Sequence, residues 1–151
     1  MARVVEVRWT WQYEFTALAT HGLDRHGDLT YALYMFIETL GGPKDVIYIG
    51  IVKSQYRDLF MRMNEHRKAW LNSVAKGQIF VKFGVIYTSE VADGQLLEDV
   101  ESALVFGRQP RENTAKKQSY RLYEDVIVRN VNHEGFLKAS YNTSKQRLTG
   151  S

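Results

Sequence analysis

The chain has 151 residues, a formal net charge of +3 and no cysteine. Disulfides and thiolate metal sites are therefore excluded, and any metal would be bound by oxygen or histidine. No apolar run approaches the roughly 20 residues that span a bilayer, and charge comes too early at the N-terminus for a signal peptide. With 44% hydrophobic residues, we expect a soluble, cytoplasmic protein of one domain, or a small core with added arms.

The first third of the chain predicts strands. Apolar residues alternate over residues 3–15, which indicates a strand, and residues 20–28 are typical of a loop. Two further strands are predicted at residues 31–38 and 46–52. Glycine and proline in the turn at 41–44 predict that this pair forms an antiparallel hairpin.

A helix and a third core strand follow the hairpin. We expect Ser54 to cap a helix that runs to about residue 72. Its buried stripe is predicted to consist of Tyr56, Leu59, Phe60, Met63 and Trp70. Residues 78–87, rich in Ile, Val and aromatics, predict the third strand.

A second helix is expected to begin at Asp93 and to end at Gly107 and Pro110. Beyond it, strands are predicted at 125–131 and 136–139, followed by a polar tail. These late strands could pair with the N-terminal strand. The whole pattern predicts an α+β fold.

Charge is unevenly distributed along the chain. Residues 83–107 contain no Lys or Arg but five acidic residues, Glu90, Asp93, Glu98, Asp99 and Glu101. Basic residues flank this stretch, and our candidates for nucleic-acid binding are Lys53, Arg57, Arg111, Lys116 and Lys117. This layout is typical of a metal-assisted site that acts on a polyanion, although solvated surface charge would give the same pattern.

Three polar residues on the two helices are candidates for a site. Arg62 and His66 are four residues apart and therefore project from one helix face. An arginine there can bind a phosphate, and a histidine can shuttle a proton. Glu101 lies at the border of an apolar helix face, where a carboxylate needs a cation such as Mg²⁺. The alternatives are a surface arginine, a partly buried histidine, and a glutamate paired with a nearby arginine.

Three further candidates lie outside the helices. Tyr34 and Tyr48 lie on neighbouring predicted strands, so their hydroxyls could converge and activate a water molecule. As isolated residues they would instead be core aromatics. Asn113 follows Pro110 and could fix the local backbone or hydrogen-bond a tyrosine and the substrate, or be a turn residue only.

Taken together, these residues resemble the GIY-YIG nuclease family. Ala32-Leu33-Tyr34 stands where the family has Gly-Ile-Tyr, and Tyr48-Ile49-Gly50 matches the second motif. The spacing of Arg62 and His66 and the order Glu101, Pro110, Asn113 match as well. The resemblance covers about residues 30–115. The chain departs from the pattern at Ala32, and at Ile51, where many members have a polar or basic residue that Lys53 could partly replace.

The resemblance implies a small three-stranded antiparallel or mixed sheet flanked by helices. Residues 30–115 would form this core, 1–29 an N-terminal extension, and 116–151 a C-terminal extension that is partly strand. Its basic tail could contact phosphates or be disordered. The implied function is a metal-dependent DNA endonuclease, with Mg²⁺ or Mn²⁺ on Glu101.

In that function the site residues have separate roles. Tyr34, helped by Tyr48 or His66, would activate the water, Arg62 would neutralise the phosphate, and Asn113 would brace the site. The alternatives are a catalytically silent module that binds nucleic acid or protein, and a small binding protein with no nucleic-acid role. A branched or sequence-specific duplex, RNA in place of DNA, and a homodimer all stay open.

Overall fold

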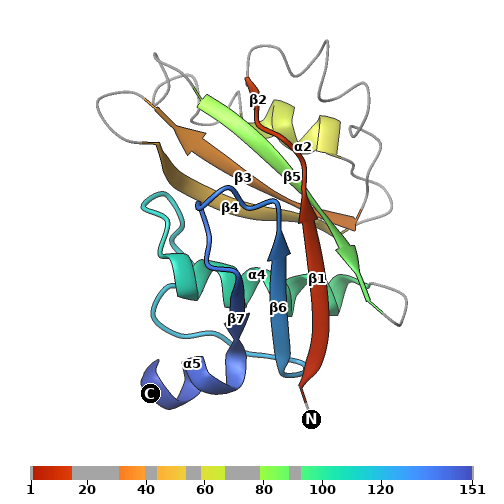
Figure 1. The fold of residues 1–151 in the computed structure, drawn as a ribbon, viewed down its shortest axis with the longest axis vertical. Helices are drawn as coiled ribbons and strands as arrows, with labels where there is room; N and C mark the ends of the chain where they lie inside the picture. The colour runs from red at the N-terminus through yellow and green to blue at the C-terminus, as the bar shows by residue number, and fades with distance from the viewer. Residues whose placement is uncertain are drawn as a thin grey trace.

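The computed structural model describes residues 2–14, 31–39, 44–53, 59–66, 79–88 and 93–150. The elements, in chain order, are β1 (Arg3–Trp9), β2 (Tyr13–Glu14), β3 (Tyr31–Glu38), β4 (Asp45–Lys53), α2 (Leu59–His66), β5 (Ile79–Tyr87), α4 (Gly94–Arg108), β6 (Val126–Val131), β7 (Ser140–Asn142) and α5 (Thr143–Gly150) (Figure 1). No helix in the described part is long and apolar enough to cross a membrane. The predicted loop at 20–28, the turn at 41–43 and the Ser54 cap lie outside the described residues.

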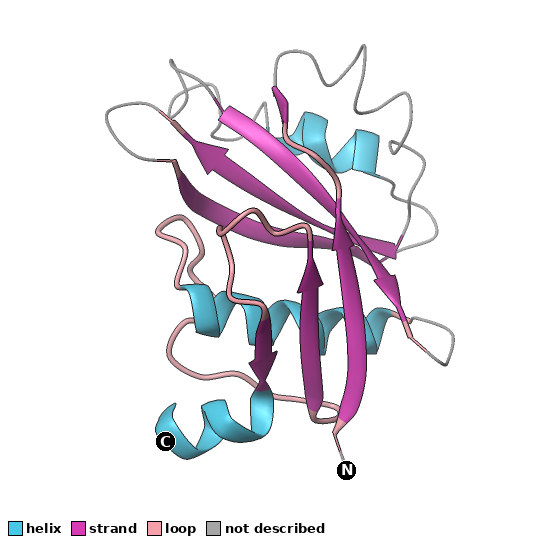
Figure 2. Cartoon of the chain, in the orientation of Figure 1, coloured by secondary structure: helices cyan, strands magenta, loops and turns pink. Residues whose placement is uncertain are grey.

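The described strands form one mixed sheet of seven strands. Their order is β4-β3-β5-β1-β6-β7, and β2 pairs with β5 beside this path. The β1–β6 pair is parallel, and the other pairs are antiparallel. Figure 2 shows that the sheet is strongly twisted between its β4 and β7 ends. The predicted α+β class is therefore confirmed, as is the antiparallel β3–β4 hairpin.

The core has two layers because β3 is buried on both of its faces. Leu33 and Met35 belong to a cluster that includes the apolar side of α4. Tyr34 and Phe36 point to the other face and pack in a cluster that contains Met63 of α2. A strand covered on both sides needs apolar residues at successive positions, which explains its continuous hydrophobic run.

The predicted N-terminal strand over 3–15 is wrong as a single element. It is divided into β1 and β2, which both pair with β5. Trp9 is opposite Gly84, but Tyr13 is opposite Val81. The segment from β1 to β2 therefore has one residue more than the stretch of β5 that it faces. Such a bulge interrupts the alternation of side chains. As a result Trp11 is 69% exposed, although Trp9 is buried.

The start and the end of α4 are both predicted correctly. Asp93 is the N-cap, and its side chain accepts a hydrogen bond of 2.8 Å from the Leu96 N–H. The helix ends at Arg108, between Gly107 and Pro110, and the residue in the left-handed conformation is Gln109, with φ of 58°. Gly107 stays helical and leaves space for the ring of Tyr141, which a side chain would displace.

The predicted strand at 125–131 is confirmed as β6, and it pairs with β1 in parallel. The predicted strand at 136–139 is wrong. Side chains bind two of its carbonyls, since Arg108 Nε donates to Phe136 O (2.7 Å) and Asn130 Nδ2 donates to Lys138 O (3.0 Å). The short strand β7 follows this segment instead.

Residues 143–150, within the predicted polar tail, form α5. The side chain of Asn142 accepts a hydrogen bond of 3.0 Å from the Ser144 N–H and so caps the start of this helix. Thr143 is buried, and its hydroxyl accepts from the Val126 N–H at 2.9 Å. These contacts join the C-terminal helix to the start of β6.

Candidate active site

Tyr34 lies at the centre of the candidate site. It is fully buried on the α2 side of β3. Its hydroxyl lies 2.6 Å from His66 Nε2 and accepts a hydrogen bond of 3.0 Å from Arg62 Nε. Arg62 and His66 are one turn apart on α2, as predicted, and both reach the same oxygen. The structure therefore brings three of the six predicted site residues together at one oxygen atom.

The protons in this triad can be assigned. Burial, helped by the positive charge of Arg62, lowers the pKa of His66 to about 4, so the imidazole is neutral at pH 7. The Arg62 N–H can only donate to the Tyr34 oxygen. Tyr34 then donates its own hydrogen to His66 Nε2, and the imidazole proton is on Nδ1. This assignment gives both hydrogen bonds of the Tyr34 hydroxyl a donor and an acceptor and keeps the phenol and the imidazole uncharged.

Tyr34 keeps its proton at neutral pH. Burial raises the pKa of its phenol well above the ordinary range, Tyr48 and Glu101 raise it further, and Arg62 opposes them. The side chain of Tyr34 is therefore a neutral phenol at this pH, not a phenolate. It can still relay a proton, because it has a donor on one side and an acceptor on the other.

Tyr48 of β4 completes an aromatic wall around the imidazole. Its ring stacks on Tyr34 with centroids 6.1 Å apart and meets His66 edge-on at 5.0 Å. Phe36 also meets His66 edge-on, at 5.2 Å. Burial alone would lower the pKa of Arg62, but attraction and hydrogen bonding to Tyr34 and Tyr48 raise it. The guanidinium thus carries its full charge beside both tyrosines.

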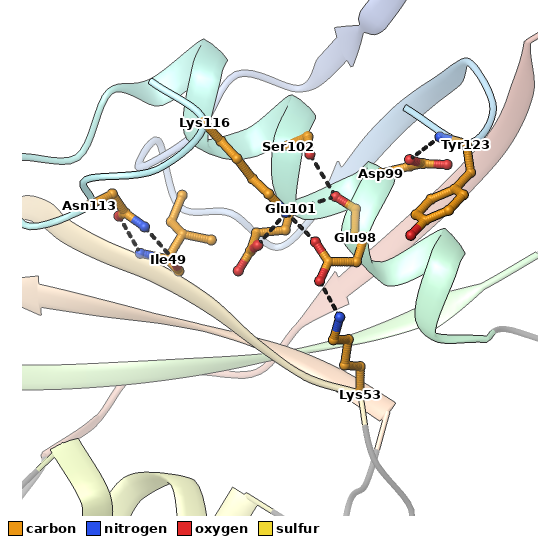
Figure 3. A network of polar contacts seen from close by, with 9 residues as sticks. All are labelled: Ile49, Lys53, Glu98, Asp99, Glu101, Ser102, Asn113, Lys116 and Tyr123. Carbon is orange, nitrogen blue, oxygen red and sulfur yellow. Dashed lines mark hydrogen bonds and ion pairs between the residues drawn. The ribbon is translucent and has the colours of Figure 1, made fainter. Parts of the chain in front are cut away.

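Glu101 projects from α4 and is mostly buried, with its side chain 16% exposed. Its carboxylate accepts a hydrogen bond of 2.7 Å from Lys116 Nζ (Figure 3). Burial raises the pKa of Glu101, while Lys116 and Arg62 oppose the shift. The helices α2 and α4 pack on opposite faces of β3. The charge of Arg62 nevertheless acts on the pKa of Glu101, and the charge of Glu101 acts on the pKa of Tyr34.

Asn113 braces the backbone of the Tyr48-Ile49-Gly50 segment. Its side-chain oxygen accepts from the Ile49 N–H at 2.9 Å, and its side-chain nitrogen donates to the Ile49 carbonyl at 2.8 Å (Figure 3). The Glu112 N–H adds a bond of 2.9 Å to the Ile47 carbonyl. These bonds satisfy the outer edge of β4, which is an edge strand of the sheet. Of the two roles predicted for Asn113, the structure shows the backbone one.

Sequence reasoning missed the ion pairs around Glu98. This carboxylate lies one turn before Glu101 on α4 and binds Lys116, and it also pairs with Lys53 Nζ at 2.5 Å (Figure 3). Lys116 thus lies between two carboxylates. The available signal was the three-residue spacing of Glu98 and Glu101, which places them on one helix face.

The candidates for nucleic-acid binding have different environments. Lys53 and Lys116 are engaged by Glu98, and Lys116 by Glu101 as well. Arg111 forms ion pairs with Glu38 and Glu112. Lys117 forms none of the ion pairs found within the described ranges, and Arg57 lies outside them. A phosphate would therefore have to compete with carboxylates for three of these cations, and their role in binding stays a prediction.

Comparisons of the chain with protein-family models, curated proteins and solved structures found no match. The function proposed below therefore depends on the chemistry of these residues.

The donor set at Glu101 limits which metal it could hold. Within the described segments, no group of three or more His, Asp or Glu side chains is arranged to bind a metal ion. A single buried carboxylate suits a hard cation that keeps most of its water, such as Mg²⁺ or Mn²⁺. Glu101 fits the expected cation on this ground.

Proposed function

We propose that this protein is a metal-dependent DNA endonuclease of the GIY-YIG type. The observation that carries the proposal is the Tyr34 hydroxyl held between the neutral imidazole of His66 and the guanidinium of Arg62. A structural tyrosine needs one hydrogen-bond partner, whereas this arrangement supplies both a proton acceptor and a positive charge. The strands β3, β4 and β5 with α2 and α4 would form the nuclease core.

In the proposed reaction, water attacks the phosphorus in line with the leaving 3′-oxygen. The Tyr34 oxygen takes a proton from the water while its own proton passes to His66 Nε2, so that a free phenolate does not accumulate. The Nε2 of a neutral imidazole is the required acceptor. Tyr48 packs against this relay and helps to hold its geometry.

Arg62 has two functions in this scheme. In the structure its Nε covers the Tyr34 hydroxyl and its Nη1 pairs with Glu65 at 3.0 Å. Its side chain is 34% exposed and can turn toward a phosphate, which it would bind and neutralise. That movement would also open the Tyr34 hydroxyl to water.

Glu101 would hold the divalent cation, and Asn113 would keep β4 in place. The cation supplies positive charge that stabilises the leaving oxygen. The Glu101 carboxylate brings a negative charge close enough to influence Tyr34, so a cation bound there would also reduce the barrier to losing the phenolic proton.

A second candidate is a catalytically silent module with the same fold. Two observations favour it, namely the complete burial of Tyr34 and the ammonium of Lys116 on the Glu101 carboxylate. Such a module would bind nucleic acid or protein without cleaving it. Divalent cations would then fail to raise its melting temperature.

Plasmid cleavage tests the two proposals. Purified protein is incubated with supercoiled DNA and Mg²⁺ or Mn²⁺, beside Glu101→Gln and the matched control Glu124→Gln, whose carboxylate is exposed and outside the site. The nuclease proposal expects nicking by wild type and Glu124→Gln and none by Glu101→Gln. Equal nicking by all three would identify a contaminant, and the absence of nicking on duplex, single-stranded, branched and flapped DNA and on RNA would favour the silent module.

A further inference from the structure

Lys116 occupies the position that a cation bound to Glu101 would need. Its Nζ donates to Glu101 Oε1 at 2.7 Å and to the backbone carbonyl of Glu98 at 3.4 Å, and it pairs with the Glu98 carboxylate (Figure 3). The Lys116 side chain is 20% exposed and that of Glu101 is 16% exposed. The ammonium is therefore held inside a largely buried cluster by two carboxylates and a carbonyl.

We propose that Lys116 is a built-in cation that holds the Glu101 carboxylate until a divalent metal ion replaces it. The inference depends on the proposed function, because it requires Glu101 to be a metal ligand. A buried carboxylate without a counterion is strongly unfavourable. Lys116 meets this need before the metal arrives, and it competes with the metal for the same oxygen lone pairs.

Glu98 makes the exchange possible at low cost. The ammonium of Lys116 already contacts the Glu98 carboxylate, so leaving Glu101 breaks one of its two ion pairs and keeps the other. Glu98 also keeps Lys53, at 2.5 Å. The displaced lysine thus remains charged and paired beside the metal.

The proposal predicts that removal of the Lys116 ammonium raises the affinity of the Glu101 site for Mn²⁺. Few other roles of a buried lysine would produce this result. In Lys116→Met the competing cation is absent and the buried carboxylate has lost its partner. Mn²⁺ is expected to bind roughly tenfold more tightly than in wild type, as for loss of one charge-assisted hydrogen bond. Lys116→Gln, which keeps a neutral donor, is expected to show the same direction. Lys116→Arg keeps the positive charge and is expected to bind Mn²⁺ like wild type.

The measurement is a titration of Mn²⁺ followed by the electron paramagnetic resonance signal of the free ion, which needs no nuclease activity. Lys138→Met is the matched control, because Lys138 is an exposed lysine outside this cluster. Melting temperatures with and without Mn²⁺ show that each variant is folded. Lys116→Met should be less stable than wild type without metal and recover more of its stability when Mn²⁺ is added.

Two failures are distinguishable. If Glu101→Gln abolishes Mn²⁺ binding but Lys116→Met and Lys116→Gln bind no more tightly than wild type, the role of Lys116 is overturned and the metal site stands. If neither wild type nor the Lys116 variants bind Mn²⁺ through Glu101, the metal site itself is wrong and both proposals fail.

Discussion

The phenol of Tyr34 occupies the space that a side chain at Gly50 would fill. The two residues are direct partners in the antiparallel β3–β4 pair. A Cβ built on Gly50 would lie within 3.0 Å of three atoms of the Tyr34 phenol, including its hydroxyl oxygen. Real Cβ contacts are essentially never this short. The last residue of Tyr48-Ile49-Gly50 is therefore what allows Tyr34 to reach Arg62 and His66.

Gly50→Ala is expected to be destabilising, because the methyl group forces the Tyr34 ring out of its position. The cost should be roughly 1–3 kcal/mol, as in other overpacked cores. The control is Gly94→Ala, where the nearest atom to a new Cβ is 3.6 Å away. That variant should change stability by no more than about 1 kcal/mol. Urea denaturation followed by circular dichroism compares the two, and equal stabilities would contradict the tight contact.

Tyr34→Phe tests the proton relay directly. The ring still fills its place, but the hydroxyl between Arg62 and His66 is lost. We expect cleavage to fall by roughly 10²–10⁴, the usual contribution of a proton-transfer group. The melting temperature should fall as well, because His66 Nε2 and Arg62 Nε lose their shared hydrogen-bond partner. Tyr31→Phe, on the same strand but 39% exposed, is the control and should cleave normally. A Tyr34→Phe enzyme with full activity would show that the hydroxyl is only structural.

The low pKa of His66 predicts how stability depends on pH. The imidazole titrates near 4 when folded and near 6.5 when unfolded. Between pH 4 and 6.5 the unfolded chain binds more protons than the folded chain. The contribution of His66 to the free energy of unfolding is therefore complete above pH 6.5 and is lost as the pH falls toward 4. The loss attributable to His66 is roughly 3 kcal/mol.

Denaturation of wild type and His66→Gln between pH 4 and 7 isolates this term, because both proteins share the titrating carboxylates. The difference between their unfolding free energies should change with pH in that interval. Nuclear magnetic resonance titration of the four histidines gives the pKa itself. A His66 midpoint at or above 6.5 would contradict the lowering of its pKa by burial and by Arg62.

Asn113 variants test whether this side chain stabilises the backbone of β4 at Ile49. Asn113→Ala leaves the Ile49 N–H and carbonyl without their side-chain partner and should cost roughly 1–3 kcal/mol. Asn113→Asp keeps the acceptor for the N–H but places a second acceptor against the carbonyl. We expect it to lie between wild type and Asn113→Ala in stability. Hydrogen exchange at the Ile49 amide reports the same bond, and an exchange rate unchanged in Asn113→Ala would argue against it.

Most of the fold and half of the site geometry follow from local patterns. The apolar run of β3 and the Asp93 cap each depend on neighbouring residues, and these predictions are confirmed. The spacing of Arg62 and His66 also predicts correctly that the two side chains lie together, because the geometry of one helix is enough to place them on the same face.

The errors arise where distant residues decide the outcome. Gly107 lies next to the end of α4, as predicted, but the reason for a glycine there is the ring of Tyr141, which follows it by more than thirty positions. The segment 136–139 has strand-forming residues, but side chains of Arg108 and Asn130 take its carbonyls. Lys116 looked like a surface cation because its two carboxylates come from a helix earlier in the chain.

The place of β1 in the sheet has a consequence for how the protein is made. This strand is synthesised early, yet it lies between β5 and β6, with Arg3 opposite Val126. One of its edges has no partner until β6 has left the ribosome. Pairings between such distant segments form slowly, and an exposed strand edge can meet other chains first. We infer that a nascent chain that stops before β6 would be prone to aggregation, and that expression trials should keep the C-terminal segment even if the candidate site ends before it.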